Sequence, residues 1–214
     1  MSKSKEYIWY ASYGSNLNEE RFLCYIKGGQ AKGSSKLLAG CNDKTPPIDN
    51  DEIYICSELY FAQQSSNWDN GGVAFINSDF DEKFQTLGRK YLITTEQFIE
   101  IVKQENNYIG ELSINFDLVI ADGSYIFKEN AWYGKIVFLG YSHDQPIFTF
   151  TNQNQIARSS RPSENYLLTI ITGLLETHTY LNNTEIVKYL ISKRGITNNY
   201  SKEELDELIK SIKI

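Results

Sequence analysis

The N-terminal run Tyr7-Ile8-Trp9-Tyr10-Ala11 leads through Ser12 into Tyr13-Gly14-Ser15-Asn16-Leu17, and this junction indicates how the chain folds. The aromatic and β-branched residues of the run predict a strand. The glycine, serine and asparagine then predict a sharp turn, and the acidic residues of Asn18-Glu19-Glu20-Arg21-Phe22-Leu23 predict the first turn of a helix. Such a junction points unpaired backbone N–H groups at one spot, which suits a carboxylate or a developing oxyanion. Gly-Ser-Asn is also common in ordinary turns, so this pattern alone leaves both interpretations open.

The composition is that of a globular protein without basic character. A chain of 214 residues is long enough for one domain with a substantial core, and 41% hydrophobic with 22% charged residues is typical of such domains. The net charge of −6 argues against a nucleic-acid partner, which selects for basic patches. The first residues lack the apolar segment of a signal peptide, and no stretch is apolar enough for a membrane span. We therefore expect a cytoplasmic protein with no membrane partner.

Cysteine and histidine are too few to indicate a metal site or a disulfide framework. The cysteines Cys24, Cys41 and Cys56 are widely spaced and odd in number, which is typical of reduced thiols in the cytosol. His143 and His178 are the only histidines in the sequence, so few residues could serve as the histidine of a Ser-His-Asp triad. The sequence therefore predicts no metal site.

Turn-forming residues divide the rest of the chain into short strands and a few helices. We expect strands at 53–61, 71–76, 86–93, 133–139 and 147–151, a loop at 44–51 and a hairpin-like insert at 108–129. We expect helices from Thr94 or Thr95 to about Glu105, from Ser163 to Leu175, from Thr184 to Lys193 with Asn183 as its cap, and after a capping box at Ser201. Interrupted strands and helices gathered at the C-terminus predict an α+β fold.

The segment at 13–17 resembles the opening motif of the gamma-glutamylcyclotransferase family, and the chain follows that family's motifs in order from residue 7 to 180. Trp68-Asp69-Asn70-Gly71-Gly72-Val73-Ala74-Phe75 looks like its second strand signature, and Gln104-Glu105-Asn106 lies where the family places its catalytic glutamate. Arg161-Pro162-Ser163-Glu164-Asn165-Tyr166, followed by Gly173 and Glu176, is similar to its proline-serine-tyrosine helix. The resemblance implies a small mixed β-barrel with helices packed outside.

The resemblance also implies an activity. A γ-glutamyl amine or γ-glutamyl peptide with a free α-amino group would be converted into 5-oxoproline and the free amine. The α-amine attacks the γ-carbonyl of the same molecule, so the reaction needs no cofactor and no metal. Well-oriented intramolecular reactions gain on the order of 10⁵–10⁸ M in effective molarity. Holding the substrate in a curled conformation would therefore supply much of the rate acceleration. Glu105 is implied as the general base and subsequent acid.

The same resemblance indicates which residues bind the substrate. The glutamyl part is expected at the turn made by Tyr13, Gly14, Ser15, Asn16 and Leu17. Backbone N–H groups of this turn would face the α-carboxylate or the oxyanion, beside the positive end of the following helix. Tyr133 and Tyr166 fall where the family has pocket tyrosines, although core packing explains such tyrosines equally well.

Two departures from the family pattern bear on the site. Asn106 stands where the family usually has glycine, and asparagine tolerates the left-handed backbone that we expect there. The segment 108–129 is longer than the family typically carries. We expect it to fold over the pocket as a lid that selects the leaving group, with Gly110 and Gly123 as hinges. A hairpin on the far side of the domain is the alternative.

Other interpretations stay open at this point. A γ-glutamylamine cyclotransferase that serves a biosynthetic deprotection step would differ only in its leaving group. A non-catalytic relative that binds a γ-glutamyl or other small ligand would not need the carboxylate of Glu105. We divide the chain into a cyclotransferase-like domain at 1–180 and a C-terminal helical extension at 181–214 packed on the same domain. The apolar faces of that extension would alternatively form the contact of a homodimer.

Overall fold

A six-stranded mixed sheet forms the centre of the protein, whose computed structural model describes residues 5–212. The strand order is β4-β7-β1-β10-β9-β8, in which β1 and β10 run parallel and the other neighbours antiparallel. A separate hairpin joins β5 to β6, and a short ladder joins β2 to β3. The strands are Tyr7–Ser12 (β1), Gly29–Gln30 (β2), Leu37–Leu38 (β3), Asp49–Ile55 (β4), Leu59–Ser65 (β5), Gly71–Ile76 (β6), Thr86–Thr94 (β7), Ser124–Ile126 (β8), Lys135–Ser142 (β9) and Gln145–Thr151 (β10).

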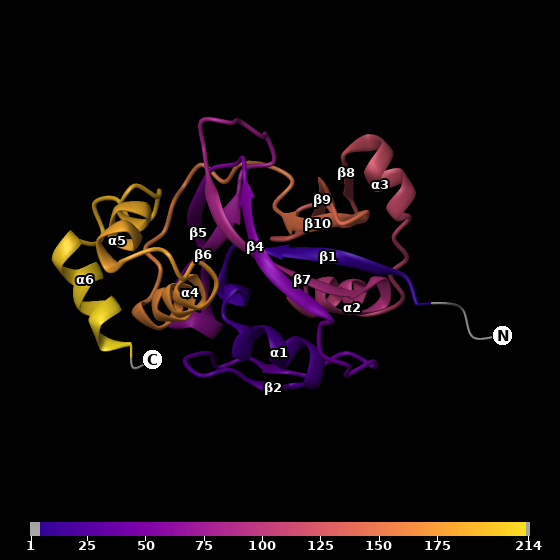
Figure 1. Cartoon of the computed structure of the whole chain (residues 1–214), viewed down its shortest axis with the longest axis horizontal. Helices are drawn as coiled ribbons and strands as arrows, with labels where there is room; N and C mark the ends of the chain where they lie inside the picture. Colours follow the sequence, from indigo (N-terminus) through magenta and orange to yellow (C-terminus); the bar gives the residue numbers. More distant parts are fainter. Residues whose placement is uncertain (1–4, 213–214) are drawn as a thin grey trace.

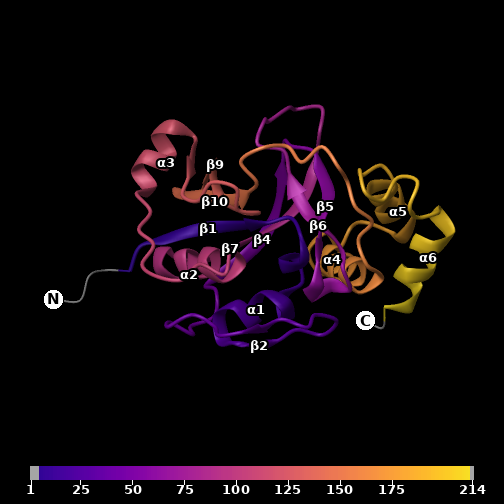
Figure 2. The same cartoon turned by 180° about the vertical axis from the view of Figure 1, so that it is seen from behind.

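Helices surround this sheet, with α3 and α6 at opposite ends of the molecule (Figures 1 and 2). Helix α4 lies between the β5–β6 hairpin and the last two helices. None of the helices within residues 5–212 combines the length and the apolar character that a bilayer span requires. The α-helices are Glu19–Lys27 (α1), Thr95–Glu105 (α2), Phe116–Asp122 (α3), Glu164–Thr177 (α4), Asn183–Ile191 (α5) and Lys202–Ser211 (α6), and the 3-10 turns are Ser15–Leu17 (η1) and Ser66–Trp68 (η2).

The first strand separates two hydrophobic cores because its side chains alternate between the two faces of the sheet. Ile8 and Tyr10 point into the core that α1, α2 and α3 cover. Trp9 and Ala11 point into the core that contains the β5–β6 hairpin and α4 to α6. All four side chains are buried, as expected for a central strand that is covered on both faces.

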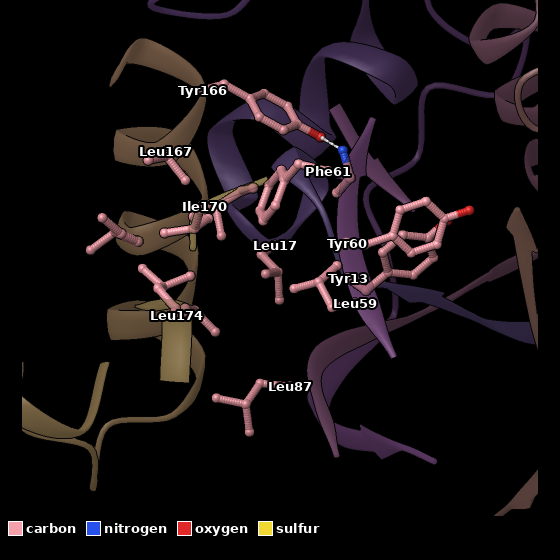
Figure 3. Close-up of a cluster of buried hydrophobic side chains, with 14 of the residues drawn as sticks. Tyr13, Leu17, Leu59, Tyr60, Phe61, Leu87, Tyr166, Leu167, Ile170 and Leu174 are labelled. Atoms are coloured by element: carbon pink, nitrogen blue, oxygen red, sulfur yellow. Dashed lines mark hydrogen bonds between the residues drawn. The ribbon is translucent and has the colours of Figure 1, made fainter. Parts of the chain in front are cut away.

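Helix α4 holds the turn that follows β1 in place. Its apolar side packs Leu167, Ile170 and Leu174 against Leu17 and the β5–β6 hairpin (Figure 3). Gly173 is where this helix comes closest to the turn, because a Cβ at that position would overlap the backbone of Leu17 and Asn18. The missing side chain therefore sets how closely α4 approaches η1.

The two C-terminal helices extend the second core. Ile186 and Leu190 of α5 and Leu205 and Ile209 of α6 are buried in the same cluster as the apolar side of α4. A capping box begins each helix, as expected at Ser201; for α5 the cap is Asn182, one residue before the expected position. The domain boundary at residue 180 and the homodimer contact stay predictions.

The expected α+β class is confirmed, and the barrel implied by the resemblance corresponds here to the mixed sheet with a separate β5–β6 hairpin. The strand expected at 53–61 is in fact two strands. The first of them, β4, already begins at Asp49, where its pairing with β7 starts opposite Leu92. The hairpin expected at 108–129 is wrong: this segment forms α3 and the edge strand β8. Asn115 caps α3 through a hydrogen bond from the Leu118 N–H group.

We predict that Gly173→Ala lowers the free energy of unfolding by ~1–3 kcal/mol, because the added methyl group forces α4 away from η1. Chemical denaturation measures this change. Thr172→Ala, the neighbouring position on the same helix, is the control and should stay close to the wild-type value. Equal stability of the glycine variant and the control would contradict the close approach.

Candidate functional site

A cavity of about 550 Å³ lies where the turn after β1, the end of α2, the β5–β6 hairpin and the loop before β9 meet. This volume is in the range of small-molecule sites. The structure brings most of the predicted site residues together at this cavity. Those that line it are Tyr13, Gly14, Ser15, Asn16, Glu105, Tyr133 and Tyr166. Leu17 differs, because its side chain is buried in the core against α4 and does not line the cavity.

Glu105 reaches the cavity as the last residue of α2. The helix begins at a capping box in which Thr94 and Gln97 satisfy each other's backbone N–H groups. Eleven residues later, the half-buried carboxylate of Glu105 accepts a hydrogen bond from Asn16 Nδ2 at 3.1 Å. The candidate base is therefore fixed to the turn that was expected to hold the substrate.

The turn itself is a single 3-10 turn whose first residues, Ser15 and Asn16, line the cavity. Its first hydrogen bond runs from the Leu17 N–H group to the Gly14 carbonyl oxygen at 3.0 Å, so the N–H groups of Ser15 and Asn16 precede the bonded part of the turn. Gly14 has a φ of −117°, which any residue can adopt. Space is tight there, because a Cβ would lie 3.2 Å from Tyr166 Oη and 3.3 Å from Ala74 Cβ.

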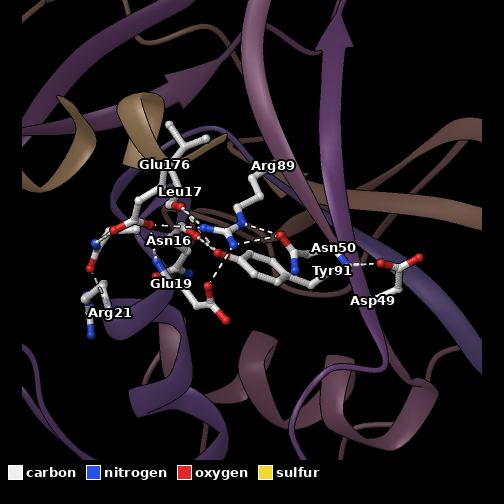
Figure 4. A network of polar contacts seen from close by, with 10 residues as sticks. Asn16, Leu17, Glu19, Arg21, Asp49, Asn50, Arg89, Tyr91 and Glu176 are labelled. Atoms are coloured by element: carbon white, nitrogen blue, oxygen red, sulfur yellow. Dashed lines mark hydrogen bonds and ion pairs between the residues drawn. The ribbon is translucent and has the colours of Figure 1, made fainter. Parts of the chain in front are cut away.

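A buried arginine fixes the carbonyl side of the same turn (Figure 4). Arg89 of β7 donates from Nη1 to the Leu17 carbonyl oxygen at 3.3 Å and to Glu176 of α4 at 3.1 Å, and from Nη2 to Glu19 of α1 at 2.9 Å. Tyr91 donates its hydroxyl to the Asn16 carbonyl oxygen at 2.9 Å. These contacts fix the backbone of the turn, whose residues Gly14 to Asn16 line the cavity.

Two pocket tyrosines meet at the backbone of Ala74. The Tyr133 hydroxyl donates to the Ala74 carbonyl oxygen at 3.0 Å, and the Tyr166 hydroxyl accepts from the Ala74 N–H group at 3.1 Å. Burial raises the pKa of Tyr166 to about 12 and holds the pKa of Tyr133 well above its usual range. Both hydroxyls therefore stay protonated at neutral pH, and Ala74 leaves the proton of Tyr166 available to a ligand. Tyr13 instead donates its hydroxyl to the Phe150 carbonyl oxygen at 2.8 Å.

Asn106 joins the base to one of these tyrosines. Its side-chain Nδ2 donates to the Val102 carbonyl oxygen at 2.9 Å and to the Tyr133 carbonyl oxygen at 3.2 Å, while its Oδ1 accepts from the Tyr133 N–H group at 3.3 Å. Its φ is −97°, so the expected left-handed residue is the next one, Asn107, with a φ of 46°. The asparagine therefore clamps the loop of Tyr133 to the end of α2, which a glycine could not do.

The sequence did not reveal several other residues that line the cavity. These are Tyr10, Arg21, Tyr25, Lys36, Trp68, Lys128 and Trp132, together with polar residues of the β5–β6 connection. Burial, followed by the nearby Glu105 carboxylate, raises the pKa of both Tyr10 and Tyr25. Arg21 had one signal in the sequence, because a cation is unfavourable in the first turn of a helix unless something nearby requires it.

The segment 108–129 lies mostly away from the cavity. Helix α3 packs Phe116 against Phe98 of α2 and Phe148 of β10, with ring centroids 5.9 and 5.1 Å apart. Residues 108–127 contribute nothing to the cavity lining, which this segment reaches only at Lys128. The body of the insert therefore covers the core between the sheet and α2, and the expectation of a lid is wrong for residues 108–127.

Comparisons with known proteins agree on the fold. No model of a known protein family matches the chain. A structure titled gamma-glutamyl cyclotransferase aligns over 96% of this chain and 99% of its own, with a TM-score of 0.53 and 18% identity. An uncharacterized protein from Homo sapiens aligns over 97% of this chain and 100% of its own, with a TM-score of 0.52 and 19% identity. The chain therefore has the gamma-glutamyl cyclotransferase fold.

One curated relative is closer in sequence but much longer. Histone deacetylase 5 of Arabidopsis thaliana is 38% identical over 185 residues, which cover 79% of this chain. The chain spans only 28% of that protein, so the name of the whole relative says nothing about the part that matches.

We predict that Asn106→Asp lowers the free energy of unfolding by ~1–3 kcal/mol, because a carboxylate cannot donate to the Val102 and Tyr133 carbonyl groups. Asn107→Asp adds the same charge one residue later, outside the clamp, and is the control. Urea denaturation compares the two variants. If both lose the same stability, the clamp does not hold the loop.

Proposed function

We propose that this protein is a cyclotransferase that converts a γ-glutamyl amine or γ-glutamyl peptide into 5-oxoproline and the free amine. One observation carries the proposal: the carboxylate of Glu105 lies at a cavity beside the Asn16 side chain of the 3-10 turn. A proton acceptor, the backbone of the 3-10 turn and protonated tyrosines then surround one space. The gamma-glutamyl cyclotransferase fold supports this assignment.

In the proposed reaction, the substrate attacks itself while the protein moves one proton. Glu105 takes a proton from the α-ammonium group, and the freed amine nitrogen forms a bond to the γ-carbonyl carbon. The ring nitrogen then gives its second proton to solvent, and the carbon–nitrogen bond to the leaving amine breaks as Glu105 returns the first proton to the leaving nitrogen. The products are 5-oxoproline and the amine, so protons and electrons balance without a further reactant.

The developing negative charge is the second task of the site. The γ-carbonyl oxygen gains charge when the ring closes, and donors that are already in place stabilise that charge without reorganisation. Ser15, Asn16 and Tyr166 line the cavity, and their N–H and hydroxyl groups are the candidate donors. We assign the oxyanion to them.

The leaving amine would lie toward the other side of the cavity. Lys128 and Trp132 come from the loop before β9, and Gln64 to Asn67 from the end of the β5–β6 hairpin. These residues mix cationic, aromatic and amide groups, so they can contact a polar leaving group. Both the peptide and the amine-deprotection form of the reaction fit this lining.

A non-catalytic relative is the second candidate, because the same turn and tyrosines would bind a ligand without turning it over. Glu105 would face the α-ammonium group of a γ-glutamyl ligand in either case, as a base in the enzyme and as a counter-ion in a binding protein, so the release of 5-oxoproline distinguishes the two candidates.

We predict that Glu105→Gln removes cyclotransferase activity by ~10²–10⁴-fold, because an amide cannot accept the ammonium proton. Release of 5-oxoproline from a panel of γ-glutamyl amines and peptides is the measurement. Glu96→Gln, which changes an exposed carboxylate on the same helix, is the control and should keep wild-type turnover. A folded Glu105→Gln variant that turns over at the wild-type rate would refute the mechanism.

We also predict that Gly14→Val abolishes binding of 5-oxoproline. Its branched side chain must displace Tyr166 Oη and Ala74, which lie against this position. Gly14→Ala, with a single methyl group, should weaken binding less. Calorimetric titration with 5-oxoproline compares the three proteins, and full affinity in the valine variant would place the ligand elsewhere.

A further inference from the structure

Arg21 is a buried cation that the protein leaves largely without partners. Its side chain comes from the first turn of α1, lines the cavity and is only 3% exposed. Nη2 donates to the Tyr25 hydroxyl at 3.0 Å. Nε and Nη1 are shielded from solvent and have no hydrogen-bond partner among the described residues. A guanidinium carries five N–H donors, so most of the hydrogen bonds that Arg21 could donate are not made.

Such an arrangement is costly unless a ligand completes it. No ion pair within residues 5–212 includes Arg21, and removing an unpaired charge from water costs several kcal/mol. The rings of Tyr25 and Trp68 lie 4.7 and 5.6 Å from its Cζ atom, which offsets part of that cost. Burial opposes the charge, but Tyr25 and Glu105 outweigh it and raise the pKa of Arg21. The group is therefore a permanent cation.

Asn16 leaves an acceptor unused at the same cavity. Its Nδ2 donates to Glu105 Oε1 at 3.1 Å and to the Tyr10 hydroxyl at 3.2 Å. A carboxylate only accepts hydrogen bonds, so the nitrogen of the amide must face Glu105. The opposite atom, Oδ1, is then buried without a partner among the described residues, in a side chain that is 3% exposed.

The other cations of the cavity differ from Arg21. Lys36 donates from Nζ to the Gln104 carbonyl oxygen at 2.6 Å, and burial lowers its pKa. Lys128 comes from the loop on the leaving-group side. Arg21 and Asn16, whose side chains hold these unused groups, are thus five positions apart in the chain, and both residues line one cavity.

We infer that Arg21 and Asn16 together recognise the zwitterionic head of an α-amino acid. The guanidinium pairs with the α-carboxylate, for which its planar donors suit a bidentate contact. The α-ammonium group lies between Asn16 Oδ1 and Glu105, which orients it toward the base. This inference rests on the proposed function for the role of Glu105. It moves the α-carboxylate from the N–H groups of the turn to Arg21 and leaves those N–H groups to the oxyanion.

Binding measurements test the inference without requiring turnover. The probe is a γ-glutamyl analogue in which a methylene group replaces the γ-carbonyl, so that no ring can close. Its α-carboxamide form removes the anion, and its deamino form removes the ammonium group. Wild-type protein should bind the parent analogue ~10–100-fold more tightly than the α-carboxamide, as expected for a hydrogen bond between charged groups.

The variants separate Arg21 from general electrostatics. Arg21→Gln should bring the ratio of affinities for carboxylate and carboxamide close to one, and Arg21→Lys should keep the charge but retain only part of the ratio. Lys27→Gln removes an exposed positive charge from the same helix and should leave the ratio unchanged. Asn16→Leu should reduce the preference for the parent over its deamino form. If Arg21→Gln does not fold, the lysine variant decides the test.

The outcomes distinguish the inference from the proposed function. A folded Arg21→Gln or Arg21→Lys protein that keeps the full wild-type ratio overturns the role of Arg21, even if the protein is a cyclotransferase. If the ratio of affinities for the carboxylate and the carboxamide depends on Arg21, the role of Arg21 is supported. This holds even if no γ-glutamyl compound is turned over, and in that case only the proposed function fails.

Discussion

The guanidinium of Arg89 ties the 3-10 turn at the cavity to two strands and two helices. From β7 it reaches Asn50 on β4, Glu19 on α1, Glu176 on α4 and the Leu17 carbonyl oxygen in the 3-10 turn. These elements belong to both sides of the sheet, so one buried side chain fixes the turn relative to the strands and to two helices. A buried charge that is fully hydrogen-bonded in this way gives a defined arrangement, whereas the loss of one partner leaves the others uncompensated.

The contrast with Arg21 separates a structural cation from a functional one. Both arginines are buried, at 5% and 3% exposure. Arg89 has acceptors for Nε, Nη1 and Nη2, including two carboxylates, whereas Arg21 has one neutral hydroxyl. Natural structures satisfy nearly all of their buried polar groups, so the exceptions call for an explanation. At a cavity that also holds Glu105 and an unpartnered amide oxygen, a ligand with complementary groups is that explanation.

The sequence predicted the parts of the fold that local signals determine. The strand, turn and helix from Tyr7 to Lys27 follow from residue types, and α2 follows from its cap at Thr94. Helix α3 was missed because alternating apolar residues from Leu112 to Ile120 favour a strand, while Phe116, Val119 and Ile120 are also spaced for a helix. Tertiary contacts with α2 and β10 decide between the two.

The candidate site was predictable only in part, for a similar reason. A resemblance to known motifs pointed to Glu105 and to the turn, and the structure places both at one cavity. Arg21 could not be found in this way, because an arginine near a helix start is usually solvated and only the folded chain shows its burial. The clamp of Asn106 is likewise a matter of geometry, since it depends on a residue 27 positions away.

The most direct test of the proposed chemistry follows the oxygen atoms. Wild-type protein is incubated with a γ-glutamyl peptide in water enriched in oxygen-18, and the products are analysed by mass spectrometry. Intramolecular attack of the α-amine predicts 5-oxoproline that contains no oxygen-18. Glutamate labelled in its γ-carboxylate would show that water attacks instead, and would contradict the account of this cavity as a site for ring closure.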